Sequence, residues 1–128
     1  VIHDFFIKIG KDKKRLKVLG NGEQSKPYMY VHEIVDAIQF IFSESDEKIN
    51  DYNVGPRDFT KVSEIANILL EETGEKREII YSGGKGGWKG DVPFYYYDAA
   101  KLRDLGWEPK YNSTQAARKA INSILNVN

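Results

Sequence analysis

Residues 16–33 read LKVLGNGEQSKPYMYVHE, and this stretch says more about the fold than any other part of the chain. It opens with the short predicted strand LKVL, and the glycines and asparagine at 20–22 predict a tight turn. A second short strand is predicted over 28–31. Apolar residues then recur at helical spacing over 31–42, which predicts a helix that ends near Ser43.

On both sides of this stretch, helices alternate with short strands. Residues 1–9 predict a helix that ends at Gly10. Downstream, we expect three short strands, over 51–54, 78–81 and 94–97. Three further helices are expected, capped at their N-termini by Thr60, by Asp98, and by Asn112 or Ser113. The first two should end at Gly74 and Gly106, and Asn112 with Gln115 should form a capping box on the third. The fold class is therefore α/β, or α+β for this chain taken alone, with short strands and about five helices.

The composition fits one domain in the cytoplasm. At 128 residues the chain suits a single core, and 19 basic residues balance 19 acidic ones, so no positive excess favours nucleic acid or an anionic membrane. The absence of cysteine fits a reducing compartment and excludes disulfides and thiolate sites. No apolar run approaches the roughly 20 residues that span a bilayer, and no signal peptide is visible. His3 and His32 stand alone, so no metal site is expected.

Two motifs resemble signatures of cofactor enzymes but lack the context that the chemistry needs. Gly84, Gly87 and Gly90 follow a predicted strand, yet a strand and not a helix is expected next, so no helix N-terminus would hold a pyrophosphate. Tyr97 and Lys101 have the spacing of a tyrosine acid/base and its lysine, although Asp98 between them is better explained as a helix cap. We interpret both motifs as coincidences.

Several stretches, read in order, match the motifs of one enzyme family. Residues 16–33 are similar to L-x-V-x-G-x-G-x-Q-x-R-D-Y-x-Y-V-x-D, the most specific match. Further matches are 53–55 with N-x-G, 62–66 with V-x-E-I-A, 88–92 with R-P-G-D-V, and 98–109 with D-x-x-K followed by L-G-W-x-P. Together they resemble the C-terminal part of extended short-chain dehydrogenases, the Rossmann-type family of UDP-glucose 4-epimerases and dTDP-glucose 4,6-dehydratases. The likeness covers nearly the whole chain.

The resemblance implies a site for a nucleotide diphosphate sugar. The base would lie along the strand at Lys17-Val18-Leu19, and Lys26 stands where the family's arginine contacts the diphosphate. Lysine keeps that positive charge without the planar fork of arginine, and Pro27 replaces the aspartate that follows in the family. Asp91 matches an aspartate that hydrogen-bonds a ribose hydroxyl.

The R-P-G-D-V motif is also altered in this chain. Trp88 replaces the arginine of R-P-G-D-V and would stack on the sugar or the base, while Lys89 or Lys85 would restore the charge. Plainer interpretations stay open from the residues alone, because a lysine such as Lys26 is ordinarily solvated and an aspartate such as Asp91 favours turns.

The implied parent is an NAD-dependent nucleotide-sugar epimerase, similar to UDP-glucose 4-epimerase and acting through a 4-keto intermediate. Its catalytic residues and N-terminal NAD-binding Rossmann domain are expected upstream, because residues 1–128 show neither and open on Val1 without methionine. The chain is thus expected to be the substrate-binding part of a homo-oligomer, inactive and without NAD when alone. Exposed apolar helix faces would make it self-associate or only marginally stable. A 4,6-dehydratase parent and a non-catalytic binding or interaction module stay open as alternatives.

Overall fold

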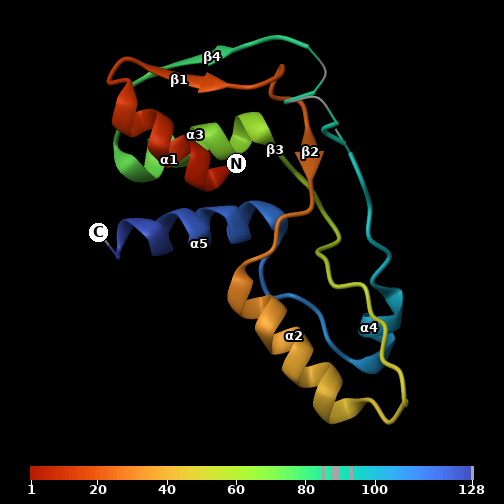
Figure 1. The fold of residues 1–128 in the computed structure, drawn as a ribbon. Helices are drawn as coiled ribbons and strands as arrows, with labels where there is room; N and C mark the ends of the chain where they lie inside the picture. Colours follow the sequence, from red (N-terminus) through yellow and green to blue (C-terminus); the bar gives the residue numbers. More distant parts are fainter. Residues whose placement is uncertain (85, 88–89, 93, 128) are drawn as a thin grey trace.

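The computed structural model describes residues 1–84, 86–87, 90–92 and 94–127 (Figure 1). The helices are α1 (Ile2–Lys11), α2 (Val31–Glu44), α3 (Val62–Thr73), α4 (Ala100–Leu105) and α5 (Ser113–Leu125). The strands are β1 (Arg15–Val18), β2 (Ser25–Lys26), β3 (Thr60–Lys61) and β4 (Glu78–Tyr81). The predicted class, a mixed α/β arrangement of short strands and about five helices, is confirmed for this part of the chain.

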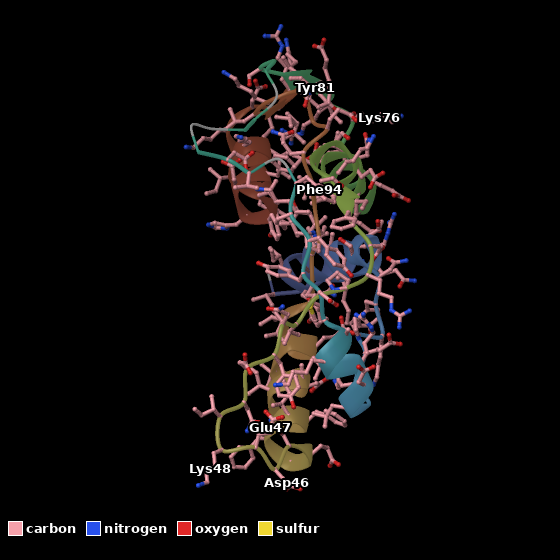
Figure 2. The ribbon with its side chains drawn as sticks, turned by 90° about the vertical axis from the view of Figure 1, so that its right-hand side faces the viewer. Asp46, Glu47, Lys48, Lys76, Tyr81 and Phe94 are labelled. Atoms are coloured by element: carbon pink, nitrogen blue, oxygen red, sulfur yellow. The ribbon has the colours of Figure 1, made fainter. Side chains whose placement is uncertain are left out.

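The strands form two small pairs that lie apart. β1 and β4 run parallel, with Leu16 opposite Ile79, whereas β2 and β3 run antiparallel. Isolated bridges also join Ser25 to Phe94 and Gly20 to Gly83. Figure 1 shows the β1–β4 pair at one end of the molecule, α2 and α4 at the other, and the β2–β3 pair between them. In the turned view of Figure 2 the same elongated shape is seen, with Phe94 between Tyr81 near one end and Glu47 near the other.

One apolar core holds α1, α3, α5 and β1 together. β1 alternates as a half-buried strand does, with Leu16 and Val18 fully buried and Lys17 exposed. The core residues are Phe5, Ile9, Leu16, Val18, Val62, Ile65, Ala66, Ile68, Leu69, Ala117 and Ile121. Because the side chains of β1 pack in this core, the core holds the start of the turn that follows the strand.

Several helix ends that depend on local signals are confirmed. Gly74 and Gly106 end α3 and α4 with φ of +67° and +114°, backbone angles that glycine adopts without a Cβ clash. α5 starts after Asn112, whose side chain accepts a hydrogen bond from the Gln115 amide in the predicted capping box. The first helix ends at Lys11, one residue beyond the predicted stop at Gly10.

Two predicted caps differ in detail. Thr60 lies in β3, and Lys61 is the N-cap of α3. The Thr60 hydroxyl is buried and hydrogen-bonds the Ser113 hydroxyl at 2.8 Å. The Thr60 side chain therefore makes a tertiary contact and does not cap the helix. At α4 the N-cap is Ala99, although the Asp98 carboxylate does accept from the Ala100 amide at 2.9 Å.

The strand predicted over 28–31 is wrong, because the pairing residues lie just before it, in β2. Pro27 has no amide hydrogen with which to extend that strand. The Tyr28 amide donates to the Ser113 hydroxyl at 2.9 Å, and Val31 already begins α2.

The strands predicted over 51–54 and 94–97 are also wrong. In the first segment the Asn53 side chain donates to the carbonyl of Asp98, and no strand pairing forms there. In the second segment only Phe94 makes a bridge, and its ring packs against Phe59 with the centroids 4.7 Å apart. Aromatic residues are common in strands, which is why a strand was predicted here. In the structure the aromatic ring of Phe94 packs against another ring instead.

Candidate functional site

A pocket of about 250 Å³ opens beside the end of β1. It lies where α1 faces the turn after β1, with β2 and the start of α3 on its other sides. Its lining residues are Val1, Asp4, Phe5, Lys8, Leu19, Gln24, Lys26, Tyr28, Val62, Gly87 and Asp91. A second cavity of about 440 Å³ near the start of α5 contains none of the residues predicted for the site. The smaller pocket is therefore the candidate site.

An ion pair between Lys26 and Asp91 forms one wall of the pocket. The Lys26 Nζ lies 2.6 Å from Asp91 Oδ1, although 65 positions separate the two residues. The Lys26 side chain is 25% exposed and the Asp91 side chain 5%. β2 fixes the lysine, because Lys26 pairs with Thr60 of β3. Two positions that the sequence predicted separately thus meet in one place.

The Asp91 carboxylate has a second partner on the same loop. Its Oδ2 accepts a hydrogen bond from the Gly87 amide at 2.9 Å. The hydrogen bond from Lys26 holds the pKa of the Asp91 carboxyl below its usual value, the Gly87 amide adds to this effect, and burial opposes it. Asp91 is therefore ionised at neutral pH and acts as a fixed hydrogen-bond acceptor.

A second ion pair, on α1, also lines the pocket. Lys8 and Asp4, one turn apart on α1, approach to 2.6 Å. The described lining thus holds two lysines and two carboxylates, and their formal charges cancel. An anion could bind Lys26 or Lys8 while each keeps its carboxylate, because an ammonium has three N–H donors. Neither Asp4 nor Lys8 was predicted as a site residue, because helix position alone does not indicate which face meets a pocket.

Gln24 is the most deeply buried polar side chain of the pocket, with 2% exposure. Its Nε2 donates to the Leu19 carbonyl at 3.1 Å, whereas its Oε1 has no hydrogen-bond partner in the part of the chain that the structure describes. Sequence reasoning did not select Gln24 as a site residue. The signal was present in the motif over 16–33, where a glutamine stands two positions before the lysine.

Tyr28 both packs against the core and lines the pocket. Burial, helped by the nearby Tyr95 and Asp91, raises the pKa of the Tyr28 phenol to about 12. The phenol therefore stays protonated at neutral pH and remains a hydrogen-bond donor. Tyr28 therefore connects the core to the pocket.

The remaining predicted site residues are distributed as follows. Leu19 lines the pocket, Val18 is buried in the core, and Lys17 is exposed on β1. Trp88 and Lys89 lie outside the described residues. The structure thus brings Leu19, Lys26 and Asp91 together, and their contacts with a ligand stay predictions.

The described residues offer no fit for a dinucleotide cofactor or a metal ion. Among the described residues, β4 ends at Tyr81 and the next helix is α4, which starts at Ala100, so they form no strand-turn-helix unit around the glycines of the loop. Lys101, the lysine of the tyrosine–lysine motif, forms ion pairs with Asp51 and Glu47. Across the described ranges, no group of three or more histidine, cysteine, aspartate or glutamate residues is placed to hold a metal. None of the described helices is long and apolar enough to cross a membrane.

The chain is similar to known proteins in sequence and in fold. The model of the family described as GDP-mannose 4,6 dehydratase matches residues 1–120. A Methanocaldococcus jannaschii protein named as a UDP-glucose 4-epimerase is 27% identical over 128 residues, which are 100% of this chain and 40% of that protein. A GDP-L-fucose synthase of Sinorhizobium fredii is 24% identical over 115 residues, 90% of this chain and 35% of that protein.

Solved structures have the same fold. A UDP-galactose 4-epimerase superposes with a TM-score of 0.81 and 30% identity, covering 98% of this chain and 40% of that one. The UDP-glucose 4-epimerase of Thermotoga maritima, solved with UDP-glucose, gives a TM-score of 0.78 and 25% identity over 98% of this chain and 39% of that one. The chain spans about 40% of the length of these relatives.

Proposed function

Because the chain belongs to the family described as GDP-mannose 4,6 dehydratase, we propose that residues 1–128 bind the sugar nucleotide in an NAD-dependent epimerase similar to UDP-glucose 4-epimerase. The relative from Methanocaldococcus jannaschii and the UDP-galactose 4-epimerase structure support this proposal. Activity, NAD and oligomeric state belong to the whole protein. For it we propose a cytoplasmic homo-oligomer whose catalytic residues lie outside this chain.

The observation that carries the proposal is the Lys26–Asp91 pair in the wall of the pocket. A cation and an ionised carboxylate 2.6 Å apart present a donor and an acceptor side by side. A nucleoside diphosphate needs this combination, because its phosphates are anionic and its ribose hydroxyls donate hydrogen bonds. Leu19, at the end of β1, supplies an apolar contact for the base next to this pair.

In this proposal the chain contributes positioning. Lys26 binds the diphosphate, Asp91 accepts a hydrogen bond from a ribose hydroxyl, and the base lies along β1. Holding a substrate in the reacting geometry lowers the entropic part of the barrier without any bond being made by these side chains. NAD, when bound by the rest of the protein, supplies the redox chemistry, and no group of this chain takes part in that step.

The test is the affinity of the intact protein for UDP-glucose, measured by isothermal titration calorimetry. Lys26→Ala should weaken binding about tenfold or more, since a charge-assisted hydrogen bond to phosphate is lost. Lys101→Ala is the matched control, because Lys101 is also an ion-paired lysine but belongs to α4, away from the pocket. Equal affinities for the wild type and Lys26→Ala would contradict the assignment of Lys26.

A second candidate is a 4,6-dehydratase. It is favoured by the name of the matching family and by an Arabidopsis thaliana relative described as a trifunctional UDP-glucose 4,6-dehydratase, 24% identical over 121 residues. The intact protein would then release a dehydrated 4-keto product from UDP-glucose, and mass spectrometry would detect the loss of water. A protein that bound no sugar nucleotide would instead be a non-catalytic binding or interaction module.

A further inference from the structure

The hydroxyl of Ser113, at the start of α5, is the centre of a buried hydrogen-bond network. Ser113 and Thr60 are both fully buried. The Ser113 Oγ accepts from the Tyr28 amide at 2.9 Å and from the Thr60 hydroxyl at 2.8 Å. It also donates to the Lys26 carbonyl at 3.3 Å. A serine hydroxyl has one donor and two acceptor positions, so this network uses all of them. Figure 1 shows the start of α5 beside the end of β2.

Two of these bonds enclose Pro27, which lies between the backbone groups that Ser113 binds. Proline has no amide hydrogen, so strand pairing by β2 cannot continue through position 27. Backbone groups that leave a strand inside the protein need partners from elsewhere. The Ser113 hydroxyl serves the carbonyl before the proline and the amide after it. One side chain thus fixes the chain on both sides of Pro27.

The serine is itself held in place by its own backbone. Its amide donates to both oxygens of the Asp58 carboxylate, at 2.9 and 3.2 Å. The capping box of Asn112 and Gln115 forms the same helix end, and α5 packs against α3 in the core. Ser113 therefore connects the segment over 26–28 to a rigid part of the molecule.

Lys26 is the residue where this network meets the pocket. Its carbonyl is bonded to Ser113, whereas its ammonium group lies 2.6 Å from Asp91 Oδ1. The lysine side chain is only 25% exposed, so its surroundings restrict its conformations. The place of the ammonium group then depends on the place of the backbone from which the side chain starts. A change at Ser113 would therefore displace the ammonium group without touching it.

We propose that Ser113 is a positioning residue, whose hydroxyl fixes residues 26–28 and so holds the Lys26 ammonium group where it binds the diphosphate. The inference rests on the proposed function, because it requires Lys26 to contact the ligand. Ser113 acts through Lys26, since it is fully buried and is not among the described residues that line the pocket. Holding a binding group in place before the ligand arrives increases affinity, because less freedom is lost on binding.

The experiment is a double-mutant cycle on the intact protein, with the affinity for UDP-glucose measured by isothermal titration calorimetry. Ser113→Ala should weaken binding about five- to tenfold, because the lysine is no longer held in the binding geometry. In the Lys26→Ala background the same substitution should change the affinity less than about twofold, because the group through which Ser113 acts is absent. A general loss of structure would instead weaken binding by the same factor in both backgrounds.

Ser123→Ala is the matched control. Ser123 also lies on α5, but its hydroxyl is bonded to the Tyr30 hydroxyl at 3.0 Å and not to residues 26–28. This variant should keep the affinity of the wild type. Wild-type affinity in Ser113→Ala, or equal factors in the two backgrounds, would overturn the role of Ser113 and leave the proposed function standing. Failure of the wild type to bind UDP-glucose would overturn both proposals.

Hydrogen exchange of the ligand-free wild type tests the proposal even if Ser113→Ala does not fold. The Tyr28 amide should exchange at least about a hundredfold more slowly than in an unstructured peptide, because the Ser113 Oγ holds it. Exchange of this amide at the rate of an unstructured peptide would show that the segment is not fixed before the ligand binds, and would overturn the proposal.

Discussion

Lys26 and Asp91 hold each other in place before any ligand arrives. The lysine is anchored by β2 and the carboxylate by the Gly87 amide, so neither side chain must be ordered when a nucleotide binds. Such preorganisation reduces the entropic cost of binding. The same pairing means that a phosphate would share the positive charge of Lys26 with the Asp91 carboxylate, which would limit the affinity for free phosphate.

The pair also predicts a pH dependence of stability. The pKa of Asp91 in the folded protein lies below its ordinary value, so the carboxylate stabilises the fold above that ordinary value, near 3.9, and this contribution is lost as the pH falls through the lower folded value. Urea unfolding should therefore find Asp91→Asn less stable than the wild type at pH 7, with the difference shrinking below about pH 4. A difference that stayed constant down to pH 2 would contradict the ion pair.

At the scale of elements, a buried carboxylate ties α2 to the segment before α5. Glu33 is 5% exposed, and its Oε1 accepts from the backbone amides of Lys110 at 2.6 Å and Tyr111 at 3.1 Å. These two residues precede the capping box of α5. One side chain thus orients a helix that is far from it in sequence.

Removing this carboxylate should be costly. Glu33→Ala leaves two backbone amides without their acceptor and should lower the free energy of unfolding by about 2 to 4 kcal/mol. Glu33→Gln is the matched control, since it keeps one acceptor oxygen and should cost less than about 1 kcal/mol. Denaturant unfolding measures both, and equal losses in the two variants would show that the amides do not depend on Glu33.

Signals within one element were sufficient to predict the helices. The apolar spacing over 31–42, the stops at Gly74 and Gly106 and the Asn112 capping box depend on residues a few positions apart, which a sequence displays directly. The two-residue strands β2 and β3 could not be predicted in this way, because they exist only through their pairing.

At the scale of the whole molecule, α2 carries apolar residues on a face that nothing in the described chain covers. The stripe consists of Val31, Ile34, Val35, Ile38 and Phe42, and Phe42 is 88% exposed. Ala37 lies on the opposite, buried face of the same helix. Figure 1 shows α2 at the end of the molecule that is remote from the core. A contiguous apolar face of this kind favours association.

Residues 1–128 alone should therefore self-associate at micromolar concentrations. Ile38→Lys places a charge in the middle of the stripe and should shift the chain towards the monomer in multi-angle light scattering. Gln39→Lys adds the same charge to the neighbouring polar position and should leave association unchanged. A wild-type chain that ran as a stable monomer would contradict the importance of this face.

Three residues of the candidate pocket were named from the sequence. Lys26, Asp91 and Leu19 followed from the resemblance, whereas their meeting in one pocket needed the tertiary structure, because Lys26 and Asp91 are 65 positions apart. The burial of Gln24 beside Gly20 and Gly87 could not be predicted, because glutamine is ordinarily exposed and this burial arises from tertiary packing. Trp88 and Lys89, at the altered motif, keep the predictions made for them.

The most direct test is a crystal structure of the intact protein with UDP-glucose. Our account predicts the diphosphate within hydrogen-bond distance of Lys26 Nζ, a ribose hydroxyl at the Asp91 carboxylate and the uracil beside Leu19. A sugar nucleotide bound elsewhere, with the Lys26–Asp91 pair undisturbed and the pocket free of ligand, would contradict it.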